Sequence, residues 1–224
     1  MPIKKAPVLA AGLTWDKPTR LQWCEPERTE TPMYQSIRIL RDEHVALASV
    51  LRTLLLLLGQ ARDAGQAPDF EVLRAILFYV AEFPEKRHHR KESDYLFPKL
   101  RALSPMSRPV LDRLDEDHRR GEFRIHELAH ALTAYEQLGE SRRAAFEVAA
   151  RQYVDFYLTH MALEEREIIP MALELLSPAD WDELDVAMAC DPDPLAGQDV
   201  DAEYDALLNR IVYAVPPPLG LGKA

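Results

Sequence analysis

Apolar residues that step by three and four through long segments are the feature that most constrains the fold of this chain. In residues 36–60 they fall at Ile37, Leu40, Leu47, Leu51, Leu54 and Leu58. This spacing places them on one face of an α-helix. We predict three further helices, over residues 69–103, 107–138 and 141–176, the first of them kinked near Pro84 because proline lacks a backbone donor.

Short connections between four long helices favour an all-α, up-down-up-down four-helix bundle. We assign residues 1–35, which are rich in Pro and Thr, to an N-terminal arm and residues 36–176 to the bundle. Residues 177–224 form a C-terminal extension with short predicted helices at 177–189 and 200–212. These helices are expected to pack against the bundle or against a partner subunit, in which case they would form a homodimer.

Composition excludes several classes of protein. The net charge of −10 argues against a nucleic-acid partner, which requires a basic face. No apolar run approaches the ~18 residues of a membrane span, so no membrane partner is expected. Cys24 and Cys190 lie far apart, which supports neither a disulfide framework nor a thiolate zinc site. We therefore expect a cytoplasmic protein with free thiols.

Histidines interrupt the apolar face where leucine would be expected. His44 continues the spacing of the first helix, His118 follows Leu111 and Leu114 in the third, and His160 follows Phe156 in the fourth. A single inward histidine is more often a hydrogen-bonded core residue than a ligand. Three on separate helices favour a shared transition-metal site, because neutral imidazole is a common metal ligand.

An internal repeat adds carboxylates to these histidines. The pattern His-x-x-x-Glu-x-x-x-x-x-Pro occurs twice, as His88, Glu92 and Pro98 and as His160, Glu164 and Pro170. Four residues turn an α-helix by ~400°, so each histidine and glutamate share a face. Counted from the helix ends at ~1.5 Å per residue, the repeats and His44 and His118 fall in one layer of an antiparallel bundle. The sequence therefore predicts a metal site in this layer.

These motifs resemble the hemerythrin-like (HHE cation-binding) family across residues 36–176. They include a lone histidine on the first helix, His-x-x-x-Glu ahead of Leu-Phe-Pro, Asp-Glu-Asp-His on the third helix and His-x-x-x-Glu-Glu on the fourth. The resemblance implies a non-haem di-iron site in which two glutamates bridge the ions. Histidine and carboxylate ligands are also compatible with zinc or manganese in place of iron. The implied ligands are His44, His88, Glu92, His118, His160 and Glu164, with Glu122 as a further candidate.

Glu122 marks a departure from oxygen-carrying hemerythrins, which have a second histidine at this position of the third helix. Four histidines with an extra carboxylate resemble the bacterial di-iron proteins of nitric oxide stress and iron-centre repair. The resemblance therefore leaves several roles open: binding or sensing of oxygen or nitric oxide, iron handling, and redox catalysis. Whether the protein is an enzyme is left open, and the expected partner is a small diatomic ligand.

Other candidates rank lower. His89 points about 100° from His88 on an α-helix, so we expect only His88 to face the core. His126 and His130 are expected to be partly exposed, and Glu165 to lie at the surface or outside the ligand shell. A ferritin-like site would pair Glu-x-x-His motifs ending at His88 and His130, at mismatched depths. A metal-free interaction bundle is the rival from a different class.

Overall fold

The computed structural model describes residues 34–190, 193, 195 and 204–214, and the regular elements in this part are all helical. The predicted arm therefore lies almost entirely outside the described residues, as do residues 200–203 of the last predicted helix. The α-helices are α1 (Gln35–Asp63), α2 (Phe70–Val80), α3 (His89–Lys91), α4 (Phe97–Leu103), α5 (Arg108–Leu138), α6 (Arg143–Leu163), α7 (Ile169–Leu175), α8 (Pro178–Ala189) and α9 (Asp205–Ala214). Two 3₁₀ turns, η3 (Pro105–Ser107) and η4 (Glu140–Arg142), precede α5 and α6.

Local sequence explains several helix boundaries. Asp69 caps α2, because its carboxylate accepts hydrogen bonds from the backbone N–H groups of Glu71 and Val72. Gly139 ends α5 with a φ of 78°, a conformation that glycine adopts without steric cost. Ser177 and Asp180 form a reciprocal capping box at the start of α8.

The predicted second and fourth helices are not continuous α-helices. Three π-helical segments interrupt them: η1 (Ala81–His88), η2 (Glu92–Leu96) and η5 (Glu164–Ile168). Pro84 lies inside η1, which agrees with the predicted distortion there. In η2 the backbone N–H of Phe97 donates a hydrogen bond to the carbonyl of Glu92, five residues earlier. In η5 the N–H of Ile169 donates to the carbonyl of Glu164 in the same way. Pro98 and Pro170 come directly after the residues that donate these bonds. Proline has no backbone N–H to donate, and the wider π-helical turn accommodates the loss of this hydrogen bond.

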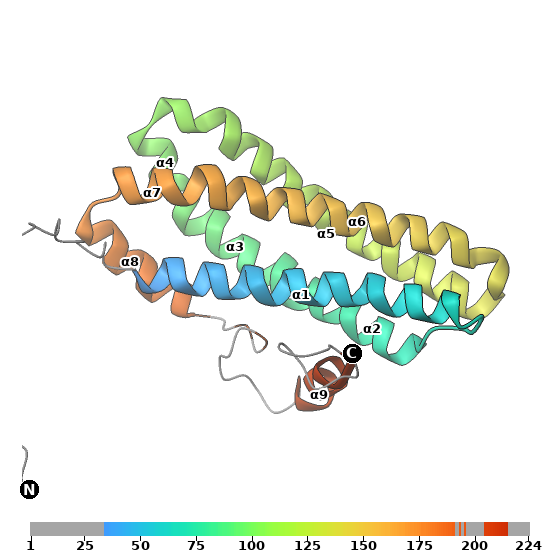
Figure 1. The fold of residues 1–224 in the computed structure, drawn as a ribbon. Helices are drawn as coiled ribbons and strands as arrows, with labels where there is room; N and C mark the ends of the chain where they lie inside the picture. Colours follow the sequence, from blue (N-terminus) through green and yellow to red (C-terminus); the bar gives the residue numbers. More distant parts are fainter. Residues whose placement is uncertain (1–33, 191–192, 194, 196–203, 215–224) are drawn as a thin grey trace, which may run out of the picture. The chain divides into compact units, whose positions relative to one another are not determined.

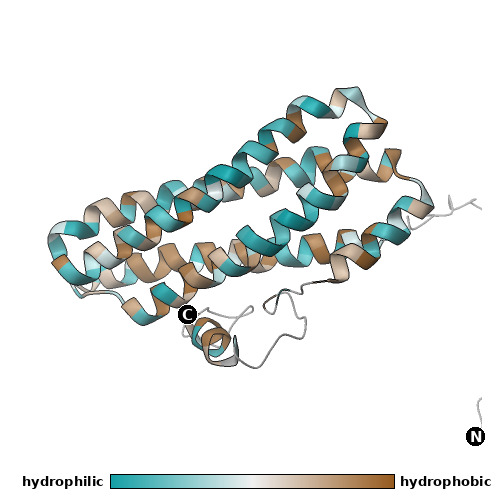
Figure 2. Ribbon diagram, turned by 180° about the vertical axis from the view of Figure 1, so that it is seen from behind, coloured by the Kyte–Doolittle hydropathy of each residue, from teal (hydrophilic) through white to brown (hydrophobic). Residues whose placement is uncertain are grey.

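The long helices lie side by side in Figure 1: α1, the α2–α4 column, α5 and the α6–α7 column. Helix α6 packs against both α1 and α5, and α2 packs against α5 and α1. Figure 2 shows that the helices carry both hydrophilic and hydrophobic residues, as expected for helices with one buried face.

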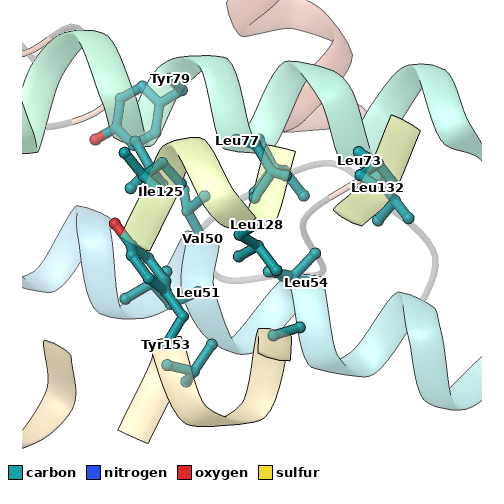
Figure 3. Packing of buried hydrophobic residues seen from close by; sticks show 14 of the residues in the cluster. Val50, Leu51, Leu54, Leu73, Leu77, Tyr79, Ile125, Leu128, Leu132 and Tyr153 are labelled. Carbon is teal, nitrogen blue, oxygen red and sulfur yellow. The ribbon is translucent and has the colours of Figure 1, made fainter. Parts of the chain in front are cut away.

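Two apolar clusters fill the interior. The larger includes Leu51 and Leu54 of α1, Leu128 of α5 and Tyr153 of α6, whose side chains converge in Figure 3. The smaller includes Leu40, Leu100 and Leu114, together with the ends of the α2–α4 and α6–α7 columns. Along each column, the histidines and glutamates of the sequence motifs fall between residues of the two clusters. A polar layer therefore separates two apolar cores.

The C-terminal helices contact the long helices. Helix α8 packs against α1, and α9 packs against α2, where Ile211 is fully buried. By length and composition alone, α1 could cross a membrane, contrary to the expectation from its apolar runs. In the structure its apolar face contributes Leu47, Leu51 and Leu54 to the core. A core helix can have the same length and composition as a membrane span, so these two properties are weak evidence for a membrane span.

Candidate metal centre

The four histidines singled out from the sequence come from four different parts of the chain and meet in the polar layer. His44 lies in α1, His88 ends η1, His118 lies in α5 and His160 lies in α6, and all four are buried. The Nε2 atoms of His44 and His88 are 3.2 Å apart. The rings of His118 and His160 have centroids 4.9 Å apart. The histidines therefore form two pairs.

Glu92 and Glu164 lie between these pairs. The two oxygens of Glu92 face different histidines, with Oε1 3.5 Å from His88 Nε2 and Oε2 3.4 Å from His118 Nε2. Glu164 does the same, with Oε2 3.3 Å from His44 Nε2 and Oε1 3.2 Å from His160 Nε2. Both carboxylates are 1% exposed, which would be costly without a counter-charge.

The resulting donor set fits two cations. One group consists of His44, His88, Glu92 and Glu164, and the other of Glu92, His118, His160 and Glu164; within each, the candidate ligand atoms lie within 4.8 Å of one another. Both glutamates belong to both groups. Several of these buried atoms also lack a hydrogen-bond partner, namely Glu92 Oε2, His118 Nε2, His160 Nε2 and both oxygens of Glu164. Imidazole nitrogens and shared carboxylates suit iron, zinc or manganese.

The ring nitrogens that face away from the layer have acidic partners. His88 Nδ1 is 2.6 Å from Glu43 Oε2, and the other oxygen of Glu43 accepts a hydrogen bond of 2.7 Å from Lys91. His44 Nδ1 is 3.1 Å from Glu165 Oε1. A carboxylate in this position fixes the ring and leaves Nε2 for a cation. Glu43 was not among the residues predicted from the sequence, although it directly precedes His44 and is buried in the first helix.

The second pair is supported less tightly. His160 Nδ1 lies 3.9 Å from Asp117 Oδ2, and His118 Nδ1 lies 3.0 Å from Ser93 Oγ. Ser93 in turn donates to Asp115 at 3.2 Å. Asp117 directly precedes His118, so neighbours of the predicted ligands supply part of the surrounding shell.

The carboxylates also determine the charges of the histidines when no cation is bound. Burial alone would lower the pKa of His44, but Glu164 and Glu165 outweigh it and raise this pKa to about 10. Burial opposes a similar shift at His160, where Glu164 and Asp117 raise the pKa to about 10. Burial also opposes ionisation of Glu164, but His160, His118 and His44 hold its pKa well below its usual value. Protons therefore supply the positive charge that a bound cation would supply.

Glu122 is not part of this arrangement, so its assignment as a ligand was wrong. Its side chain is exposed, and it belongs to neither histidine–glutamate group. The buried stripe of α5 runs from His118 through Gly121 to Ile125. Glu122 therefore falls beside this stripe and faces outward.

His89 is the second correction, because it is buried together with His88 rather than turned away from the core. It forms a third group with His118 and His160. The expectation from α-helical geometry failed because His88 ends a π-helical segment, in which the turn holds an additional residue. By contrast, His126 and His130 are exposed as expected, which also excludes the ferritin-like pairing.

A buried acidic cluster adjoins His89. Glu85 Oε1 accepts hydrogen bonds from the hydroxyls of Tyr153, at 2.8 Å, and Tyr157. Burial raises the pKa of Glu85 to about 7, although both tyrosine hydroxyls act to lower it. Gly121 makes room for this cluster, since a Cβ there would overlap the Tyr157 hydroxyl and come within 2.9 Å of Glu85 Oε1.

Comparison with known proteins agrees with this arrangement. The sequence model of the hemerythrin HHE cation-binding domain matches residues 35–172, which span α1 to α7 and contain all the histidines and glutamates of the polar layer. No curated protein and no solved structure gave a significant match. The match covers more than half of the chain and, with the helical fold, shows that the chain belongs to the hemerythrin HHE cation-binding family.

Proposed function

We propose that this protein is an up-down-up-down four-helix bundle that binds two iron ions and uses them to bind or sense oxygen or nitric oxide. One observation carries the proposal: both Glu92 and Glu164 direct their two oxygens toward different histidine pairs. A carboxylate that bound one cation, or simply balanced one histidine, would not need this arrangement twice. Zinc or manganese fits the same ligands.

The assigned ligand roles follow from this geometry. His44 and His88 would hold one ion, His118 and His160 the other, and Glu92 and Glu164 would bridge them. Bound iron would supply reversible electron transfer and coordination positions that a diatomic molecule can occupy. The protein side chains orient the imidazoles, exclude water and balance charge.

A surface hollow supports access of a small ligand. It has a volume of about 490 Å³, and His44, Ala48, Met161 and Glu165 are among the residues that line it. Because the lining contains both an imidazole of the polar layer and apolar side chains, an uncharged diatomic molecule could reach the site from this side.

The metal-free interaction bundle explains the interior poorly. Buried polar atoms without partners each cost free energy, roughly 1–3 kcal/mol in proteins. The layer contains several such atoms in Glu92, His118, His160 and Glu164, which lie within 4 Å of an oppositely charged group but form no aligned hydrogen bond. A bundle that served only to dock a partner would gain nothing from them.

A redox role is the second candidate, and the cluster of Glu85, Tyr153 and Tyr157 favours it. The cluster places exchangeable protons beside the polar layer, with Glu85 Oε2 3.2 Å from His89 Nδ1. Reduction of a small ligand consumes protons, and these groups could deliver them. Iron-centre repair and nitric oxide detoxification belong to this class.

The experiment is anaerobic loading with ferrous iron, followed by titration with oxygen and, separately, with nitric oxide. A spectrum that changes on addition of oxygen and returns on its removal would support binding or sensing. Rapid irreversible oxidation with turnover would support the redox role instead. Failure to retain any metal after gel filtration would contradict both.

A further inference from the structure

His89 is a buried imidazole that the four-histidine assignment does not use. Its side chain is 4% exposed, and it begins α3 directly after the π-helical segment η1. The backbone N–H of His89 donates to the carbonyl of Pro84, five residues earlier. This wider turn allows two consecutive imidazoles, His88 and His89, to lie in the interior.

The neighbours of His89 are the second histidine pair. A candidate ligand nitrogen of His89 lies within 4.8 Å of those of His118 and His160. The ring centroid of His89 is 4.1 Å from that of His118 and 5.4 Å from that of His160. No such group joins His89 to His44 among the described residues, so His89 belongs to one side of the layer.

The surroundings of His89 match those of the other four histidines. Each of those rings has its Nδ1 within 4 Å of a side-chain oxygen, from Glu165, Glu43, Ser93 or Asp117. His89 Nδ1 has Glu85 Oε2 at 3.2 Å. Tyr153 and Tyr157 hold Glu85 in place. A carboxylate in this position can accept a hydrogen bond from Nδ1–H once the ring is aligned with it, which leaves the opposite ring nitrogen for a cation.

We propose that His89 is a fifth imidazole ligand and that it binds the cation held by His118 and His160. The inference rests on the proposed function, because it requires a metal pair in the polar layer. It makes the two metal positions unequal: one has three imidazoles, and the other, with His44 and His88, has two. The position with fewer protein ligands is the one beside the surface hollow.

The proposal requires one movement. The rings of His89 and His118 are nearly parallel, with an interplanar angle of 10°. A cation lies in the plane of each imidazole that binds it, so two stacked rings cannot bind the same ion without a tilt. Glu85 Oε2 and His89 Nδ1 both lack a properly aligned hydrogen bond, so rotation of the His89 ring breaks no such bond at these atoms.

The test is proton NMR of the protein loaded with cobalt(II), a paramagnetic probe that shifts the ring N–H signal of each bound histidine far outside the normal range. We expect five shifted, exchangeable N–H signals in the wild-type protein and four in His89→Gln. His130→Gln, which changes an exposed histidine, is the matched control and should keep all five.

The wild-type count is informative even if His89→Gln does not fold. Four signals in the wild-type protein would overturn the assignment of His89 and leave the metal pair intact. Two or fewer signals would contradict the metal pair itself, and with it the proposed function. As a second readout, we expect His89→Gln to lose about half of its cobalt on dialysis against a weak chelator, whereas His130→Gln should lose none.

Discussion

The two copies of the His-x-x-x-Glu repeat agree in the backbone that follows each glutamate and differ in the backbone at each histidine and in the surrounding residues. In both copies the glutamate begins a π-helical turn and a proline follows that turn. In both, the glutamate is 1% exposed and reaches two histidines. The backbone distortion is therefore part of the repeat, and it places a buried carboxylate in the layer twice.

The differences lie in the supporting residues. His88 has a close partner in Glu43, at 2.6 Å, whereas the partner of His160, Asp117, lies at 3.9 Å. His88 is followed by a second buried imidazole, His89, whereas His160 is followed by Met161. The comparison teaches that a symmetric repeat can produce an unsymmetric metal site, because the chain outside the motif determines how rigidly each ligand is held.

Removal of a bridging carboxylate should have the largest effect. We expect Glu164→Ala to reduce retained iron from two ions per chain to one or none, and Glu92→Ala to have a slightly smaller effect. Among the described residues, Glu164 lies within 4 Å of three histidines, His44, His118 and His160, whereas Glu92 lies within 4 Å of two, His88 and His118. Elemental analysis after gel filtration measures the change. Glu167→Ala, at an exposed position, is the control; two ions retained by Glu164→Ala would refute the bridging role.

Removal of the carboxylates that support His88 and His160 should have unequal effects on metal binding. We expect Glu43→Gln to weaken metal binding by about 10–100-fold, the range found for residues that orient metal ligands, and Asp117→Asn to weaken it less. The shorter contact to His88 is the reason. Competition with a calibrated chelator measures both affinities. Equal losses in the two variants would show that the difference in distance has no functional meaning.

Gly121 tests the cluster of Glu85, Tyr153 and Tyr157 that adjoins His89. Gly121→Ala should lower the free energy of unfolding by about 1–3 kcal/mol, the usual cost of overpacking, because the new methyl group meets Tyr157 and Glu85. Chemical denaturation of the metal-free protein measures this effect. Gly59→Ala is the control, since nothing lies within 4 Å of a Cβ at that position. An unchanged stability of Gly121→Ala would mean that Tyr157 is not held in the position described.

Proton release on metal binding should be the smallest effect. It reports on one histidine from each pair, His44 and His160. His44 and His160 have pKa values of about 10 in the metal-free protein, so both are charged at neutral pH. A cation binds only neutral imidazole, so uptake at pH 7 should release at least two protons, because burial is also outweighed at His118 by Glu164 and Glu92, which raise its pKa. Affinity should rise with pH until the rings are deprotonated. Calorimetry in buffers of different ionisation enthalpy counts the protons. Release of none would contradict these charge states.

Much of the helical fold and the positions of most candidate ligands could be predicted from the sequence. The spacing of Leu47, Leu51 and Leu54 identified a buried face, and the inward positions of His44 and His160 followed from the same rule. The error over His89 came from applying ideal α-helical geometry locally, whereas Glu122 was a candidate only because of the family resemblance. The turn that brings His89 inward is π-helical, and the buried stripe of α5 passes through Gly121 rather than Glu122. Glu43 was missed because nothing in the apolar spacing distinguishes a buried supporting carboxylate from an exposed one.

The central claim is that this chain holds two metal ions bridged by Glu92 and Glu164. The most direct test is Mössbauer spectroscopy of protein loaded with iron-57 and oxidised, combined with an iron count per chain. We expect two iron ions per chain and a spectrum of two ferric ions coupled to a diamagnetic ground state. A single uncoupled ferric ion, or no retained iron, would contradict it.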